Sequence, residues 1–216
     1  ISKEKMILAG MPKLDWLARK LEIKKNLFKN NNPTFYYNPH WDMKFSSYLK
    51  WKKHILNFFS EKQDLNLIFS PHPLVKHMSK REGYAIENEK EIPDNIIIDY
   101  GSDYCIDGTY NSASDVYIGD VSSMITEFIM HKPRPCLFIN AHDIDWVGNE
   151  DYHFWEMGNV VNDVNNFPKH IFQSLELNHH EEKQLKMKND FVYRSSIDSS
   201  KICAKSIQNI LRETST

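Results

Sequence analysis

The fold of this chain is decided by residues 116–131, which open with Val116-Tyr117-Ile118-Gly119-Asp120-Val121-Ser122-Ser123 and continue with helical spacing. An apolar strand ends here in small polar residues and passes directly into a helix. Such a junction leaves backbone N–H groups and short hydroxyls at the positive end of the helix dipole, where they suit an anion. We therefore predict a phosphate site at Ser122 and Ser123, with Asp120 beside them. The alternative is that both serines only cap the helix.

A second apolar strand, Leu67-Ile68-Phe69, ends in Ser70-Pro71-His72-Pro73. The two prolines restrict the backbone around His72, which suits a phosphate ligand or a proton donor, although such a sequence also forms plain turns. His40 also follows a strand and a proline, with packing beside Trp41 as the alternative. His40 and Pro73 are further candidates for the site. Ligands of open parallel sheets sit above the carboxyl ends of the strands, so these tips predict a nucleotide-diphosphate site.

Two more groups of polar residues are expected to face the same crevice. Asp99, Gly101 and Ser102 follow a third apolar strand and are predicted to contact the base or the ribose. Glu127 lies one helical turn after Ser123 on the same face, where its carboxylate would accept hydrogen bonds from ribose hydroxyls. A solvated glutamate is the alternative for this position.

The rest of the chain alternates short apolar strands with helical patterns. Strands are predicted over 34–37, 65–69, 96–99, 116–119 and 135–140, with 158–162 as a candidate sixth strand. Helices are predicted over 13–30, 45–60, 75–81, 122–131, 167–175, 181–193 and 200–212, and a short helix or turn over 104–114. Uniformly apolar strands between helices are typical of a parallel sheet that is covered on both faces. We predict an α/β, Rossmann-like doubly wound sheet. The expected organisation is an interdomain segment with a basic helix (1–32), a nucleotide-binding domain (33–176) and C-terminal helices packing on it (177–216).

Composition narrows the class of protein. The chain has 216 residues, of which 41% are hydrophobic and 12% aromatic, so a substantial core is expected. Its seven glycines form none of the usual phosphate-loop fingerprints. There is no apolar run long enough to span a membrane and no signal-peptide pattern. Three cysteines without paired spacing favour reduced thiols in a cytoplasmic protein. Because the chain begins at Ile1 and not at a methionine, we interpret it as a fragment of a longer protein.

Charge is distributed unevenly along the chain. Residues 1–53 contain twelve basic and four acidic residues, so their net charge is +8 and that of the remainder is −10. A basic stretch is typical of a surface that meets a polyanion or anionic lipid, and a solvated helix is the alternative. We therefore include peripheral contact with the inner face of the cell membrane among the expectations. No nucleic-acid-binding motif accompanies the charge, so no nucleic-acid partner is predicted.

Two histidine-containing clusters bear on metal binding. His179-His180-Glu181-Glu182 does not predict a metal site, because adjacent side chains on a helix do not converge and the i, i+4 histidine pair is missing. His142, Asp143 and Asp145 would be able to hold a divalent cation near a pyrophosphate. No other cofactor is predicted.

Three segments resemble the CDP-glycerol glycerophosphotransferase family, which makes teichoic-acid-type and capsule polymers. Gly10-Met-Pro12-Lys13-Leu-Asp15-Trp-Leu17 is similar to its G-x-P-[KR]-x-D-x-L segment, and His72-Pro73 to its H-P motif. Residues 113–128, followed by Lys132-Pro133, resemble its A-D-x-x-I-T-D-Y-S-S-x-x-x-[DE]-[FY]…K-P block. Gly119 replaces the usual Thr, Val121 the Tyr and Glu127 the commoner Asp. The matches cover roughly residues 7 to 140.

The resemblance implies the C-terminal, donor-binding half of a GT-B glycosyltransferase-like fold. It implies that His72 contacts the donor pyrophosphate and is important for transfer, that Ser122 and Ser123 bind the diphosphate, and that Glu127 binds ribose. The implied reaction moves glycerol phosphate, or a related polyol phosphate, from a CDP-activated donor to a lipid-linked or polymeric acceptor. The acceptor and its general base would come from an N-terminal half, so this chain alone is expected to be inactive.

The departures from the family pattern keep the donor open between CDP-glycerol, CDP-ribitol and a nucleotide sugar. A nucleotide-sugar glycosyltransferase of capsule or lipopolysaccharide synthesis is the enzyme alternative, together with a sugar epimerase of the same fold. A non-catalytic nucleotide-binding domain is the alternative from another class.

Overall fold

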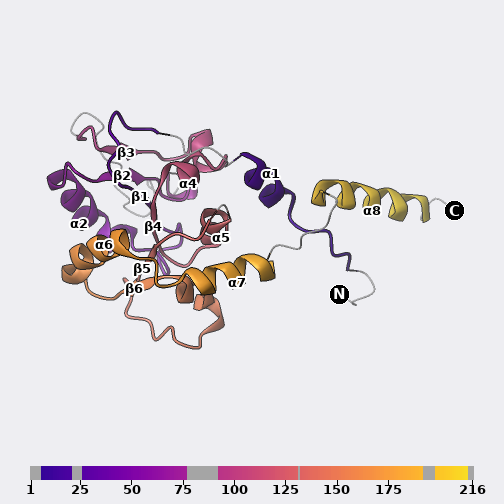
Figure 1. Cartoon of the computed structure of the whole chain (residues 1–216). Coiled ribbons are helices and arrows are strands. Elements are labelled where there is room, and N and C mark those ends of the chain that lie inside the picture. Colours follow the sequence, from indigo (N-terminus) through magenta and orange to yellow (C-terminus); the bar gives the residue numbers. More distant parts are fainter. Residues whose placement is uncertain (1–5, 21–25, 77–91, 131, 192–197, 214–216) are drawn as a thin grey trace.

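The computed structural model of the protein describes residues 6–20, 26–76, 92–130, 132–191 and 198–213. Its centre is a six-stranded parallel sheet with the order β3-β2-β1-β4-β5-β6 (Figure 1). The strands are β1 Thr34–Asn38, β2 Asn66–Phe69, β3 Ile96–Ile98, β4 Val116–Gly119, β5 Cys136–Ile139 and β6 Asn159–Val161. This order is that of the doubly wound Rossmann sheet, in which the strands after β1 are added first on one side of it (β2, β3) and then on the other (β4, β5, β6). The predicted fold class is confirmed.

Helices cover both faces of the sheet because neighbouring strand residues point in opposite directions. On one face, Phe35 and Tyr37 pack with α2 (Tyr48–Glu61) and α6 (Phe167–Glu176). On the other face, Tyr36 lies in a second apolar cluster. That cluster includes residues of α4 (Thr109–Ala113), α5 (Met124–Ile129) and the 3-10 segment η4 (Glu150–Met157), and α7 (Glu181–Phe191) packs against it. Two shorter 3-10 turns, η3 Asp103–Cys105 and η5 Val164–Asn166, complete the connections.

The helix predicted over 13–30 is shorter in the structure. The helix α1 runs from Pro12 to Lys20, residues 21–25 lie outside the described residues, and residues 26–32 are not helical and bend at 28–30. Asn26 accepts a hydrogen bond from the N–H of Phe28 at 3.1 Å, and Asn30 accepts one from the N–H of Asn32 at 3.0 Å. Asparagine side chains compete in this way with the helical hydrogen bonds of the backbone. The predicted helix is therefore wrong over residues 26–30. The helix predicted over 75–81 begins at Leu74, and its continuation lies outside the described residues.

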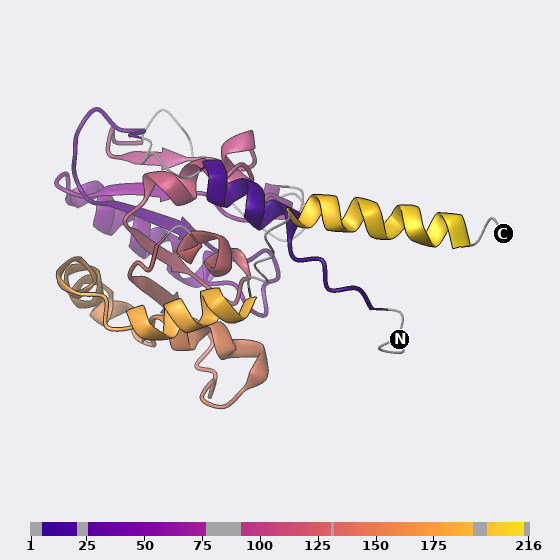
Figure 2. The same cartoon turned by 45° about the vertical axis from the view of Figure 1, so that its right-hand side comes forward.

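The C-terminal helices behave differently from one another. Gln184 of α7 is fully buried and donates to the carbonyl oxygens of Arg134 and Met157, so α7 is part of the domain. In contrast, α8 (Ser199–Glu213) extends away from the sheet beside α1 (Figures 1 and 2). Its apolar stripe is exposed at Ile207, Ile210 and Leu211. The start of α8 contacts α1, where the N–H of Ser199 donates to Asp15 at 2.7 Å.

None of the helices in the described part of the chain has the length and apolar character needed to cross a membrane. The three cysteines carry free thiols, of which Cys105 and Cys136 are buried.

Candidate functional site

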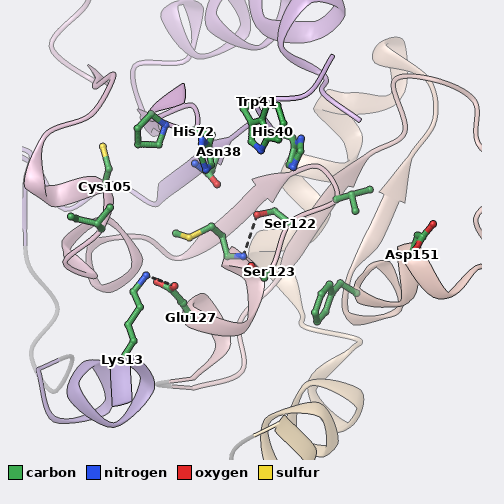
Figure 3. Close-up of a pocket in the computed structure, with 15 residues that line it drawn as sticks. Lys13, Asn38, His40, Trp41, His72, Cys105, Ser122, Ser123, Glu127 and Asp151 are labelled. Carbon is green, nitrogen blue, oxygen red and sulfur yellow. Dashed lines mark hydrogen bonds and ion pairs between the residues drawn. The ribbon is translucent and has the colours of Figure 1, made fainter. Parts of the chain in front are cut away.

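A cavity of about 610 Å³ opens at the carboxyl ends of β1, β2 and β4, where the strand order reverses (Figure 3). Its lining comes from six separate parts of the chain: Lys13, Asn38, His40, Trp41, His72, Pro73, Cys105, Ile106, Val121, Ser122, Ser123, Met124, Glu127, Asp151 and Phe154. His72 and Ser123 thus face one shared space, as the strand-tip argument predicts. His40, Pro73, Ser122 and Glu127 join them there.

The hydroxyls of the two serines that follow β4 differ in their hydrogen bonding. Ser122 accepts a hydrogen bond from the N–H of Met124 at 3.2 Å, so its hydroxyl serves the start of α5. Ser123 makes no capping hydrogen bond through its side chain and is exposed. The capping alternative therefore accounts for Ser122 but not for Ser123. Because α5 has six residues and begins later than predicted, few peptide dipoles add up behind this tip.

His40 and His72 flank Trp41 at the rim of the cavity, with ring centroids 5.5 Å and 6.5 Å from the indole. The Nδ1 atom of His40 accepts from the N–H of Asp42 at 3.0 Å, and that of His72 from the N–H of Leu74 at 3.2 Å. Each neutral ring therefore carries its proton on Nε2. Burial lowers the pKa of both histidines, and the neighbouring His40 lowers that of His72 further. Both rings are thus neutral hydrogen-bond donors near pH 7.

Asp120 stands behind the cavity wall and does not line it. Its side chain is fully buried, and Oδ2 accepts from the N–H groups of His40 at 2.8 Å and Ser47 at 2.9 Å. Its other oxygen, Oδ1, has no hydrogen-bond partner among the described residues. Burial raises the pKa of Asp120 to about 7, against the opposing effect of hydrogen bonds from Ser47 and His40. Asp120 thus positions the His40 loop, which differs from the direct diphosphate contact that the sequence predicted.

The predicted base or ribose residues Asp99, Gly101 and Ser102 are not among the residues that line the cavity. They form one turn in which Asp99 accepts from the N–H groups of Gly101 and Ser102, both at 2.9 Å, and from the hydroxyl of Tyr110 at 2.6 Å. The hydroxyl of Ser102 also donates to Asp99. Burial alone would raise the pKa of Asp99, but the hydrogen bonds from Ser102, Tyr110 and Gly101 outweigh it and hold the pKa at about 2.

The structure adds lining residues that sequence reasoning missed. The ammonium of Lys13 lies 2.5 Å from Oε1 of Glu127 (Figure 3). Lys13 belongs to the Gly10-Met-Pro12-Lys13 motif, which was the available signal. Asp151 and Phe154 come from η4, whose sequence has no clear periodicity, so no pattern marked them.

Among the described residues, no three His, Cys, Asp or Glu side chains gather closely enough to hold a metal ion. His142 instead contacts the carbonyl oxygen of Ser46 through Nε2 at 3.0 Å, and Asp143 occupies a left-handed turn with φ 54°. The cluster proposed for a divalent cation, His142 with Asp143 and Asp145, is therefore not assembled.

The departure at Gly119 has a packing explanation. A Cβ atom placed on Gly119 would lie 2.4 Å from the hydroxyl oxygen of Tyr117, two residues earlier on the same face of β4. That hydroxyl is buried and has no hydrogen-bond partner among the described residues. The phenol of Tyr117 thus fills the volume that the family's threonine would need.

Comparisons with known proteins agree with this architecture. A structure of a variant of the wall teichoic acid polymerase TagF, soaked with CDPG, has a TM-score of 0.66 at 17% identity, covering 99% of this chain and 52% of the other. A second TagF variant has a TM-score of 0.66 at 16% identity, covering 100% and 55%. UDP-GlcNAc 2-epimerase from Neisseria meningitidis has a TM-score of 0.54 at 15% identity, covering 97% and 56%.

These identities show the shared fold, and the chain spans about half the length of each of these structures. Sequence comparison with curated proteins finds no significant match. The sequence model of one family, CDP-glycerol:poly(glycerophosphate) glycerophosphotransferase, matches residues 1–206, which is nearly the whole chain. The chain therefore belongs to this glycerophosphotransferase family.

Proposed function

We propose that this chain binds the nucleotide of CDP-glycerol, or of a related CDP-activated polyol, in an enzyme that transfers glycerol phosphate to a growing cell-surface polymer. The observation that carries the proposal is the shared cavity at the strand tips, which His72 and Ser123 both line. Family membership and the likeness to a TagF structure soaked with CDPG support this donor.

In the proposed reaction an acceptor hydroxyl attacks the phosphorus that carries the glycerol. A new P–O bond forms, the bridging P–O bond breaks, and CMP leaves. The acceptor proton passes to a base outside this chain. Such transfers depend on positioning and on neutralising charge more than on covalent help. Ser122 and Ser123 would hold the phosphate oxygens. His72, with its proton on Nε2, would donate to the oxygen on which charge develops as CMP departs.

Calorimetric titration of the chain with CDP and UDP tests the proposal. We expect CDP to bind more tightly than UDP, and Ser123→Ala to weaken CDP binding on the order of tenfold, because a hydrogen bond to a charged group is lost. Ser123→Ala is preferable to Ser122→Ala because Ser122 also caps α5. Ser60→Ala, on α2 and outside the cavity, is the matched control. Equal heats with and without the Ser123 hydroxyl would remove this residue from the site.

In the full-length enzyme, His72→Ala should cut transfer sharply while the thermal unfolding midpoint stays within a few degrees of the parent. Unchanged transfer would exclude His72 from the reaction.

A nucleotide sugar is the second candidate donor, because the chain has Glu127 in place of the family's commoner Asp and also resembles UDP-GlcNAc 2-epimerase in fold. A donor panel distinguishes the two: tighter binding of UDP-sugars than of CDP-glycerol would favour this alternative.

The acceptor is proposed to be lipid-linked or polymeric and to approach from a part of the protein outside this chain. The excess of positive charge in residues 1–53 supports contact with an anionic membrane surface. Co-sedimentation with anionic vesicles, and not with neutral ones, would support that contact, and equal behaviour with both would contradict it.

A further inference from the structure

The cavity has little permanent positive charge of its own. Among the described residues that line it, Lys13 is the single lysine or arginine, and two carboxylates, Glu127 and Asp151, share the lining. The two histidines there are neutral near pH 7 because burial lowers the pKa of each. A nucleoside diphosphate brings several negative charges into this space. Cations that meet such charges are a main means of binding and activating phosphates.

The motif Gly10-Met-Pro12-Lys13 explains how Lys13 comes to lie over the cavity. Gly10 has a left-handed backbone with φ 84°, which other residues rarely adopt. Pro12 then opens α1 at the position where proline is most favourable in a helix. Together they turn the chain so that Lys13 stands in the first turn of α1 and faces α5 (Figure 3).

The same helix is held in place from two sides. Leu14 and Leu17 are buried with Met130, which follows α5. Asp15 accepts a hydrogen bond from the N–H of Ser199, at the start of α8, at 2.7 Å. The position of Lys13 is therefore set by packing and not by its own ion pair alone.

Lys13 does not stabilise α1 itself, because a positive charge in the first turn of a helix interacts unfavourably with the helix dipole. Its ammonium instead lies 2.5 Å from Oε1 of Glu127, with the lysine side chain 45% exposed and the glutamate side chain 13% exposed. The second oxygen of Glu127, Oε2, is buried and has no hydrogen-bond partner among the described residues. A buried carboxylate oxygen that accepts no hydrogen bond destabilises the folded protein. The site, as far as the described residues show, therefore lacks a hydrogen-bond donor for Oε2 of Glu127.

We propose that Lys13 is the cation that binds the diphosphate of the nucleotide, and that it exchanges Glu127 for phosphate when the nucleotide enters. This inference rests on the proposed function and assigns a role to Lys13 within it. Without ligand, Lys13 neutralises Glu127. On binding, two ribose hydroxyls take over as donors to the carboxylate, and the ammonium moves to the phosphate oxygens. The exchange gives both carboxylate oxygens of Glu127 a hydrogen-bond donor. It also places the ammonium of Lys13 beside the phosphate of the departing CMP.

The test is calorimetric titration of the chain with cytidine and with CDP at two salt concentrations. Lys13→Met keeps most of the apolar stem and removes the charge. We expect it to weaken CDP binding on the order of tenfold or more and to flatten the salt dependence, since an ionic contact to phosphate is lost. Cytidine binding should stay the same or strengthen, because ribose no longer has to displace the lysine. Lys13→Arg should bind CDP within a few-fold of the parent.

The matched control is Lys183→Met, which removes a lysine from another Lys–Glu pair, with Glu156, that lies on the surface and outside the cavity. It should leave both titrations unchanged. Equal losses for cytidine and CDP in Lys13→Met would show that the lysine only supports the structure, and would overturn the inference. Unchanged CDP binding would overturn it as well. If the parent chain binds neither CDP nor UDP, the proposed function fails, and the role of Lys13 fails with it.

Discussion

Asp120 and Asp99 are the first residues after two strands of the same sheet, β4 and β3, yet the pKa values of their carboxyl groups are shifted in opposite directions. Both accept hydrogen bonds from backbone N–H groups and thereby hold a loop at the carboxyl end of the sheet. Burial raises the pKa of Asp120 to about 7, whereas hydrogen bonds from Ser102 and Tyr110 overcome burial and hold that of Asp99 at about 2.

The difference follows from the number of donors and the access of water. Asp99 is half-buried and receives donors on both oxygens. Asp120 is fully buried, and its two backbone donors reach the same oxygen. An equivalent place in the sheet therefore does not fix the charge of a strand-end aspartate. The neighbouring loop determines whether the carboxylate receives enough hydrogen bonds to lower its pKa, or is buried with too few of them and has its pKa raised.

The largest effect is expected from removing the buried carboxylate. Asp120→Ala leaves the N–H groups of His40 and Ser47 without an acceptor in the interior. Each unpaired group costs about 1–3 kcal/mol, so we expect a loss of roughly 2–6 kcal/mol in the free energy of unfolding at pH 5. Urea denaturation of Asp120→Ala and Asp99→Ala measures both. A loss for Asp99→Ala as large as that for Asp120→Ala would break the comparison.

The next effect is a pH dependence of opposite sign at the two sites. The pKa of Asp120 is raised in the folded state, so the unfolded chain gives up this proton first and stability falls as pH rises from about 4 to about 7. Since one pKa unit corresponds to about 1.4 kcal/mol, the fall attributable to Asp120 is on the order of 2–4 kcal/mol. Asp120→Asn should abolish it. The difference in unfolding free energy between parent and variant, followed across this range, isolates the group from the histidines, and a flat difference would refute the assignment.

Asp99 should show the reverse behaviour at lower pH. Its pKa is lowered in the folded state, so its contribution is fully present above about pH 4 and is lost as pH falls towards 2. Because Asp99 is half exposed, solvent screens its interactions and we expect Asp99→Asn to cost no more than about 1 kcal/mol at neutral pH. Thermal unfolding of the parent and Asp99→Asn at pH 6 and pH 2.5 measures the effect. The two curves should approach each other at the lower pH.

The smallest effect sharpens the account of Asp99. Ser102→Ala removes one exposed donor to the carboxylate and leaves the backbone donors in place. The expected loss of stability is at most about 0.5 kcal/mol, because water replaces much of an exposed hydrogen bond. The pKa of Asp99, measured by NMR titration, should rise in this variant. No rise would mean that the other donors alone hold the pKa low.

Sequence reasoning succeeds here where the signal is local. The six strands were predictable because each is a short apolar run followed by small polar residues, and the meeting of His72 with Ser123 follows from parallel strands ending at one edge. It fails where the orientation of a side chain depends on a neighbouring loop. Asp99 and Asp120 stand at the predicted edge, but their side chains turn to backbone donors that no pattern in the sequence announces. Lys13 was missed for a related reason, since its contact with Glu127 depends on how α1 docks.

The phenol of Tyr117 occupies the space above Gly119 and makes substitutions at these two positions depend on each other. A threonine at 119 cannot be introduced alone without strain, because the new side chain would enter the volume that the Tyr117 phenol occupies. A smaller residue at 117 has to come first, at the cost of a temporary void, and the threonine can then follow. The effect of a substitution at 119 is thus set by the side chain two residues earlier, so the two positions can be exchanged without a clash or a void only when they change together.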